Sequence, residues 1–276
     1  MRNDTISASP SFTFEQSAVQ GRRLANLYWL QFVLELRKQF RIPFAWIGTV
    51  IFPLGFYSVF GLIFGASSTT EVDSIVSASY LATYGAFGVM GVALFSFGVG
   101  VATERGQGWL RLQRVTPMPP LAYFTAKIGS SLVFSTLSVL SLFAAGMIVG
   151  RVRLPLELWL ALIVTLVFGA LPFCAFGLVL GYAAGPNSAP ILANVIYLPV
   201  AIASGLWVPI EFLPPVMQTL AKFLPAYHYA QLALTVLGTN QGSSRLFHVG
   251  ALLLFTAVCL MVASFLYRRD SGRTYG

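Results

Sequence analysis

Residues 156–184 read LELWLALIVTLVFGALPFCAFGLVLGYAA, and Glu157 is the only charged side chain among them. A helix of about 20 apolar residues crosses the hydrocarbon core of a bilayer. Five more runs of this kind lie at residues 44–64, 78–102, 121–149, 189–210 and 247–267. Such a run can also be a buried helix of a large soluble protein. Six of them, with so few charges between them, favour six transmembrane helices.

The composition of the whole chain supports a membrane protein. Of its 276 residues, 57% are apolar and 9% are charged, against about 45–50% and about 25% in an average soluble domain. Disorder is excluded because disordered chains are poor in aromatic and aliphatic residues. We therefore expect an all-α polytopic membrane protein with a single transmembrane domain over residues 1–276. It would comprise a cytoplasmic tail and interfacial helix at 1–42, a six-span bundle at 44–267 and a cytoplasmic tail at 268–276.

The basic residues near the spans predict their orientation, because cytoplasmic loops carry an excess of Lys and Arg. With a cytoplasmic N-terminus, only four of the 17 basic residues fall outside: Arg151, Arg153, Lys222 and Arg245. The net charge of +8 is therefore interpreted as a topology signal. Nucleic-acid binding is not expected, since the chain has no Lys/Arg-rich run. Both termini are predicted to be cytoplasmic, and the polar N-terminal segment predicts no secretory signal peptide.

Residues 24–41 predict an amphipathic helix that lies on the membrane surface. Its apolar face recurs at helical spacing, at Trp29, Val33, Leu36 and Phe40. Gln31, Glu35 and Lys38 fall on another face. Arg37, Lys38 and Arg41 could meet anionic lipid head groups, and Pro43 would separate this helix from the first span. The alternative is a cytoplasmic tail whose basic residues only set the topology.

The loop after the second span, residues 103–117, mixes charged residues with exposed apolar ones. It reads TERGQGWLRLQRVTP, so it can form a short amphipathic helix that Pro117 and the following prolines end. Trp109, Leu110 and Leu112 would offer apolar side chains to a cytosolic partner, with a cationic rim around them. The alternative is an ordinary loop that carries only the positive-inside signal.

The segment before the last span, residues 206–236, is rich in proline and predicts outer re-entrant helices. Its marker residues are Pro209, Glu211, Pro214, Pro215 and Pro225. Residues 216–223, between the prolines, are too few to span, and backbone at membrane depth needs protein or an aqueous cavity around it. His228, between two tyrosines, fits an aromatic belt at the interface. The alternative role for His228 is titration near neutral pH.

Glycines spaced by four residues predict close helix packing in the fourth span, at Gly177, Gly181 and Gly185. The second span carries a looser stripe of small residues, at Gly85, Gly88, Gly91 and Gly98. Small residues on one helical face let a neighbouring backbone approach closely. A gating hinge is the alternative interpretation of both stripes.

Several kinds of functional residue are missing from the sequence. No ionisable residue lies near the middle of a predicted span, which weighs against an ion-coupled carrier. The chain has no G-x-x-x-x-G-K-[ST] nucleotide loop, and its scattered acids form no hydrolase or transferase arrangement. Cys174 and Cys259 lie inside apolar runs, so neither a disulfide framework nor a metal site is expected.

The 103–117 loop resembles the cytoplasmic loop of the ATP-binding cassette type-2 permeases. Members of that family typically read E-R-E-x-G-T-L-E-x-L, then T-P, then G-K a few residues into the next helix. The matching residues here are Glu104, Arg105, Gly108, Leu110, Arg114, Thr116, Pro117 and Lys127. The chain departs from this pattern at four positions: Gly106 and Arg111 replace acids, Trp109 replaces Thr, and Ala126 replaces Gly. The loss of the two acids makes this loop more basic. Six spans, an amphipathic N-terminal helix and a proline-rich outer segment extend the resemblance over most of the chain.

The resemblance implies the transmembrane subunit of an ATP-driven exporter in a bacterial inner membrane. Two copies, or this chain and a related permease, would surround the pathway, and a separate ATP-binding subunit would dock on the cytoplasmic side. ATP and Mg²⁺ would bind to that partner, so this chain is expected to be no enzyme and to hold no cofactor. The expected coupling contacts are Glu104, Arg105, Gly108, Trp109, Leu110, Arg111 and Arg114.

Two other functions stay open. One is a secondary carrier or channel that works alone, and the other is a membrane scaffold or sensor subunit without transport. The charge-free, Phe-rich spans fit an apolar or amphipathic cargo, such as a lipid, a drug or a lipid-linked glycan, although lipid-facing surfaces are also rich in Phe.

Overall fold

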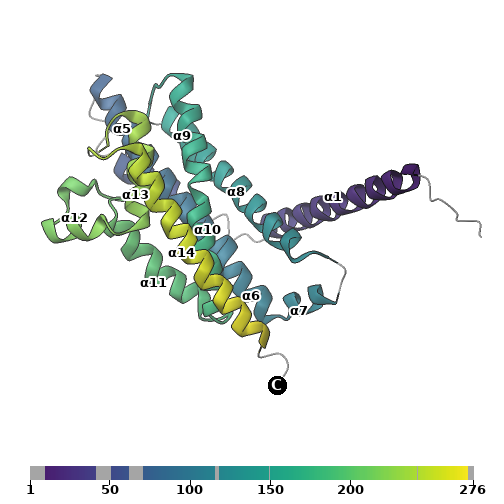
Figure 1. Ribbon diagram of the computed structural model, residues 1–276. Helices are drawn as coiled ribbons and strands as arrows, with labels where there is room; N and C mark the ends of the chain where they lie inside the picture. The colour runs from purple at the N-terminus through teal and green to yellow at the C-terminus, as the bar shows by residue number, and fades with distance from the viewer. Residues whose placement is uncertain are drawn as a thin grey trace, which may run out of the picture.

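The computed structural model describes residues 10–41, 51–61, 71–115, 118–148, 150–240 and 242–272, and the regular structure in them is helical. Four helical stretches in these residues are long and apolar enough to cross a bilayer: Ile75–Gly106, Leu121–Ile148, Leu156–Ala183 and Arg245–Asp270. They correspond to the second, third, fourth and sixth predicted spans, and they pack side by side in a bundle (Figure 1). Of the first predicted span, residues 44–64, the structure describes residues 51–61, which form the short helix α3 (Phe52–Phe56) and the π-helix η2 (Tyr57–Gly61); the rest of that span lies outside the described residues.

The second span is one continuous helical stretch that runs the length of the bundle. It consists of α5 (Glu71–Gly91), the π-helix η3 (Val92–Val99) and α6 (Gly100–Gly106). It is longer at both ends than the predicted range 78–102. The π turn is wider than an α turn, is rare, and is frequently found at functional sites. In this span it separates the half that begins at Glu71 from the half that carries Glu104 and Arg105.

The third and fourth spans are α8 (Pro120–Ile148) and the pair α9 (Leu156–Phe168) and α10 (Ala170–Ala183). The fourth span breaks at Gly169, because the ring of Tyr229 occupies the space of a side chain there. A Cβ at Gly169 would lie 2.1 Å from a carbon of that ring. The Tyr229 hydroxyl donates to the Leu166 carbonyl at 2.6 Å, and Pro172 is tolerated in the first turn of α10.

The fifth predicted span, residues 189–210, is too long. Helix α11 (Ala189–Ala203) ends seven residues earlier, where Gly205 takes a positive φ of 77° and Pro209 follows. A helix of this length measures about 22 Å, which is shorter than the hydrocarbon core of about 30 Å.

Three short helices follow α11 and lie near one end of the bundle: η4 (Ile210–Phe212), α12 (Pro215–Ala221) and α13 (Pro225–Leu237). Pro215 and Pro225 stand at the first position of their helices, where a missing N–H is harmless. Helix α13 packs against α5, α9 and α14 (Arg245–Gly272). We call this end of the bundle the α12 end. The opposite end, where α6 leads into α7 (Trp109–Arg114) and where α14 finishes, is the α7 end (Figure 1).

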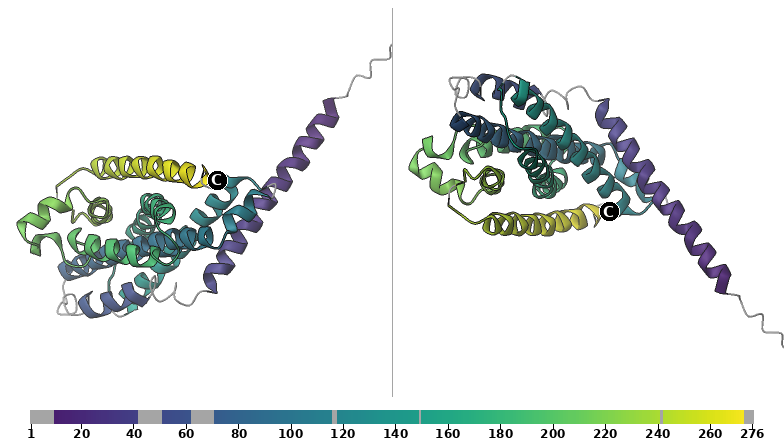
Figure 2. Two further views of the ribbon diagram at one scale, coloured as in Figure 1. Left: turned by 90° about the horizontal axis from the view of Figure 1, so that it is seen from below. Right: turned by 90° about the horizontal axis from the view of Figure 1, so that it is seen from above.

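Helix α1 (Pro10–Phe40) begins earlier than the predicted residue 24, and its N-terminal part extends beyond the bundle (Figure 2). Its C-terminal half packs on α8. The polar face makes this contact: Glu35 and Gln39 are buried, whereas Trp29 is 65% exposed. The predicted apolar face is divided: Trp29 and Phe40 are exposed, although the Phe40 ring lies 5.0 Å from the Phe134 ring of α8, and Val33 and Leu36 are partly buried. The polar residues Glu35 and Gln39 find their partners on α8.

Candidate coupling site

A cluster of charged side chains joins α1, α6 and α8 at the α7 end. Its centre is Lys127 of α8, whose side chain is 1% exposed. The Lys127 ammonium lies 2.8 Å from Oε1 of Glu35 in α1 and 3.1 Å from Oε1 of Glu104 in α6. One buried cation therefore holds carboxylates from two other helices.

Lys38 and Tyr123 complete this cluster. Lys38 donates to Oε2 of Glu35 at 2.6 Å and also to Oε1 of Glu104. Tyr123 of α8 donates its hydroxyl to Oε2 of Glu104 at 2.6 Å. The coupling cluster, by which we mean these five residues, thus contains two cations, two anions and a phenol. Its formal charges cancel.

The electrostatics explain why these charges can be buried. Desolvation of an ion costs several kcal/mol, and only close opposite charges and hydrogen bonds offset that cost. Burial by itself lowers the pKa of Lys38, but the carboxylates of Glu104 and Glu35 outweigh it and raise that pKa above its usual value. Lys38 therefore stays charged. The ion pairs and hydrogen bonds of the cluster connect α1, α6 and α8.

Arg105, next to Glu104, connects α6 to two further helices, α10 and α14. Its two Nη atoms donate to the carbonyl oxygens of Tyr182 at 2.8 Å and of Ala184 at 2.7 Å. These carbonyls lie at the end of α10, where the last carbonyl oxygens of a helix have no N–H donors within the helix and where a cation is favoured. Arg105 also pairs with Asp270 near the end of α14 at 3.3 Å.

Helix α7 follows a tight turn. Gly108 has a φ of 80°, which a glycine adopts at no steric cost. Gly106 lies against the ring of Pro186, where a Cβ would come within 2.6 Å of Cγ. Trp109 is 56% exposed and Leu112 is 60% exposed, whereas Leu110 is partly buried against the core. The helix is thus held at its base, and two apolar side chains project from it.

The predicted coupling residues therefore divide into two groups. Glu104 and Arg105, which are expected to be coupling contacts, bind the chain's own helices. Leu110 also packs inward. Trp109 lies on the surface, and Arg111 and Arg114 belong to α7, of which only the backbone is described at those two positions. The inward direction of Glu104 has a physical reason, since its carboxylate pairs with the buried Lys127 and with Lys38.

Sequence reasoning missed the pairing of Glu35 with Lys127. Glu35 was assigned to the polar face of a surface helix, and Lys127 entered only through the family pattern. A usable signal exists, because a lysine inside an apolar helix needs a counter-ion. The sequence shows that requirement, but it does not show which of the nearby acids fulfils it.

Other residues singled out from the sequence lie away from the coupling cluster. Arg37 of α1 is exposed, and Val33 and Leu36 are partly buried. Gly177 and Gly181 face the second span: a Cβ on Gly177 would lie 2.7 Å from the Ala93 carbonyl oxygen, and one on Gly181 would lie 2.8 Å from Val101. Gly185 does not share this face, since α10 ends at Ala183.

His228 does not sit in an aromatic belt. Its side chain is buried, and its Nδ1 lies 3.0 Å from Nδ1 of His248. Its Nε2 lies 3.0 Å from the Lys222 carbonyl oxygen, which can only accept. His228 therefore donates from Nε2 and accepts from His248 at Nδ1. Within the described residues, no three His, Cys, Asp or Glu side chains are close enough to hold a metal ion.

Comparison with known proteins agrees with this geometry. The family model of the ABC-2 type transporter matches residues 26–238, from within α1 to just past α13, and this range includes the whole coupling cluster and α7. The "Putative transport permease YvfS" of Bacillus subtilis (strain 168) is 27% identical over 247 residues, which are 90% of this chain and 99% of that protein. The chain therefore belongs to the ABC-2 type transporter family of membrane permeases.

Proposed function

We propose that this permease is the transmembrane subunit of an ATP-driven exporter and that a separate ATP-binding subunit docks on α7. The observation that carries the proposal is the arrangement at the α7 end. A short helix with two exposed apolar side chains lies directly beside the residues that join the second span to four other helices. ATP and Mg²⁺ would bind to the partner subunit.

Force applied to α7 has a direct route into the bundle. Helix α7 follows α6 after only two residues, Gln107 and Gly108. Glu104 transfers any displacement of α6 to α1 and α8 through the coupling cluster, and Arg105 transfers it to α10 and α14. The second span then carries the movement to the α12 end through the π turn of η3. A rigid link of this kind moves helices together, because packed helices shift as units.

Docking of a cytoplasmic ATP-binding subunit on α7 would also define the orientation of the permease in the membrane. The α7 end would face the cytoplasm of a bacterium, with both termini on that side, and α1 would lie on the inner surface with Trp29 toward lipid. The short helices η4, α12 and α13 would form re-entrant structure at the outer end. Two permease copies, identical or related, would enclose the pathway.

Replacement of the exposed side chains of α7 tests this proposal. We expect the double variant Trp109→Ala/Leu112→Ala to lose co-purification with the ATP-binding subunit and to lose cargo-stimulated ATP hydrolysis. Truncating a central aromatic anchor typically costs about 2 kcal/mol or more of binding free energy. The control is Phe223→Ala, an aromatic residue after α12 that is even more exposed than Trp109.

If the folded double variant binds and stimulates the ATPase like the unmodified protein, α7 is not the docking helix. Transport by purified permease in liposomes without any ATPase would instead support the stand-alone carrier.

A further inference from the structure

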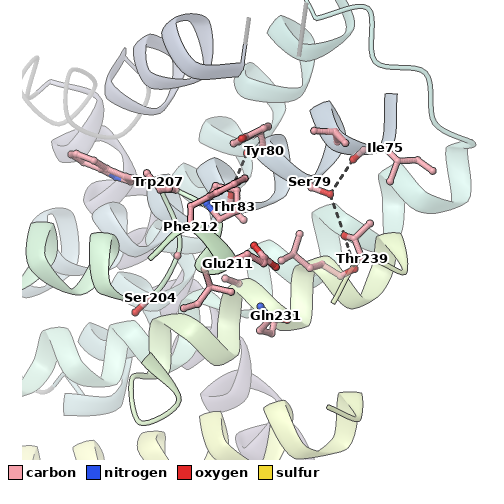
Figure 3. A pocket seen from close by; sticks show the side chains of 17 residues that line it. Ile75, Ser79, Tyr80, Thr83, Ser204, Trp207, Glu211, Phe212, Gln231 and Thr239 are labelled. Carbon is pink, nitrogen blue, oxygen red and sulfur yellow. Dashed lines mark hydrogen bonds between the residues drawn. The ribbon is translucent and has the colours of Figure 1, made fainter. Parts of the chain in front are cut away.

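A cavity of about 680 Å³ lies at the α12 end, far along the second span from the coupling cluster (Figure 3). Three segments enclose it: the first turns of α5, the loop from Ser204 to Phe212, and the middle of α13. Pockets for small organic ligands typically measure about 300–1,000 Å³. The volume therefore fits one drug-sized molecule.

The cavity is lined mainly by apolar and aromatic side chains, with a single carboxylate. Among the described residues that line it, Glu211 is the only charged one. Tyr80, Trp207 and Phe212 provide the aromatic rings. Glu211 and Phe212 are exposed, whereas Thr83 and Gln231 are buried. Figure 3 shows the Glu211 side chain surrounded by other lining residues. The cavity thus has an anionic rim and a buried interior.

The walls of the cavity are held in place by hydrogen bonds. The Tyr84 hydroxyl donates to the Trp207 carbonyl at 3.1 Å, which ties the loop to α5. The hydroxyls of Ser79 and Thr239 lie 3.1 Å apart and join α5 to the segment after α13. A cavity whose walls are linked in this way is largely formed before a ligand arrives, which lowers the entropic cost of binding.

We propose that this cavity binds an amphipathic organic cation, as a cargo station at the outer end of the export pathway; the cargo role rests on the proposed function. The cationic group lies against Glu211 at the rim, and the apolar body lies against the rings of Tyr80 and Trp207. Aromatic faces attract cations as well as apolar groups. An anionic ligand gains nothing here, because no lysine or arginine lines the described cavity.

Binding to the full-length permease in lipid nanodiscs tests the cavity without any ATPase. The probes are tetraphenylphosphonium and tetraphenylborate, which have nearly the same shape and opposite charge. We expect saturable binding of the cation by isothermal titration calorimetry and at least about tenfold weaker binding of the anion. Glu211→Gln should weaken cation binding about tenfold, and Glu211→Asp should retain most of it. Glu157→Gln, an exposed carboxylate outside the cavity, should leave binding unchanged.

Equal binding of the cation by the Glu211→Gln variant and the unmodified protein overturns the proposal, as does equal binding of the two probes. A co-purified neutral lipid that the cation does not displace also overturns it. Failure of the α7 experiment overturns the coupling assignment but not the binding site, because the binding assay contains no ATPase.

Discussion

At the scale of single residues, the permease places its few charges where they join helices. Lys127 is the clearest case, since it is almost completely buried and binds carboxylates from α1 and α6. A buried ion pair contributes little net stability compared with apolar packing, but removal of one partner leaves an unpaired charge. The cluster is therefore better explained as a specific connection between helices than as a source of stability.

Substitution of Lys127 should show this dependence. We expect Lys127→Met to lower the free energy of unfolding by about 3–5 kcal/mol, because Glu35 and Glu104 would then share only Lys38. The double variant Glu35→Gln/Lys127→Met should cost less than the sum of the two single variants. Thermal denaturation of the purified protein, arranged as a double-mutant cycle, measures both effects. Additive costs would show that Glu35 and Lys127 do not interact.

At the scale of elements, the second span combines an irregular middle with unusually close packing. Gly98, at the end of η3, approaches α10 so closely that a Cβ would lie 2.9 Å from Cα of Gly177. Here backbone meets backbone, so no side chain can move aside to relieve a clash. The four-residue glycine spacing in the sequence indicated this kind of approach. The partner glycine and the π turn beside it depend on the assembled bundle.

We expect Gly98→Ala to destabilise the permease by about 1–3 kcal/mol, because the two helices must separate to admit the methyl group. Gly250→Ala in α14 is the matched control, since a Cβ there meets nothing within 4 Å. That control should be neutral or should stabilise the protein, as alanine is the better helix former. Melting temperatures measured in one detergent compare the two variants. A Gly98→Ala protein as stable as the control would mean that α10 and the second span are not in tight contact.

At the scale of the whole molecule, the second span links the two ends of the bundle. Its α5 half lines the cavity at the α12 end, and its α6 half carries Glu104 and Arg105 at the α7 end. Arg105 ties the α6 half to the ends of α10 and α14. If an ATP-binding subunit docks on α7 as proposed, different side chains would carry docking and transmission into the bundle, and experiment can separate the two.

We expect Arg105→Ala to keep co-purification with the ATPase, because the partly buried Arg105 belongs to α6 and its guanidinium binds the ends of α10 and α14. Cargo-stimulated ATP hydrolysis should fall about tenfold or more, since three charge-assisted hydrogen bonds between α6 and the bundle would be lost. Lys222→Ala, at the α12 end, serves as the control. Loss of ATPase binding by a folded Arg105→Ala protein would place Arg105 at the docking surface.

Much of the element pattern could be predicted from the sequence, because each apolar run is a local property. The four long helices follow the runs at 78–102, 121–149, 156–184 and 247–267 within a few residues. The end of α11 was missed because Leu206, Trp207 and Val208 continue the apolar run although they no longer form a helix. The early start of α1 was missed because residues 10–23 carry no apolar periodicity.

The coupling cluster could be predicted only in part. Glu104 and Arg105 were selected through their resemblance to a family loop, but the sequence did not predict that both bind other helices of the same chain. Helical spacing predicts which residues share a face of a helix. It does not predict which of the faces packs against the other helices of the protein. For α1, the polar face with Glu35 turns inward, because α8 presents Lys127 there.

By itself, the sequence determined that this protein is a helical membrane permease, where most of its helices lie and which loop carries the family pattern. Those properties depend on the hydrophobicity and spacing of neighbouring residues. Only the tertiary structure decided which charges pair, that His228 binds His248, and that residues from α5, the 204–212 loop and α13 enclose a cavity. Such contacts join residues far apart in the chain, and their energies depend on distances that exist only after the helices pack.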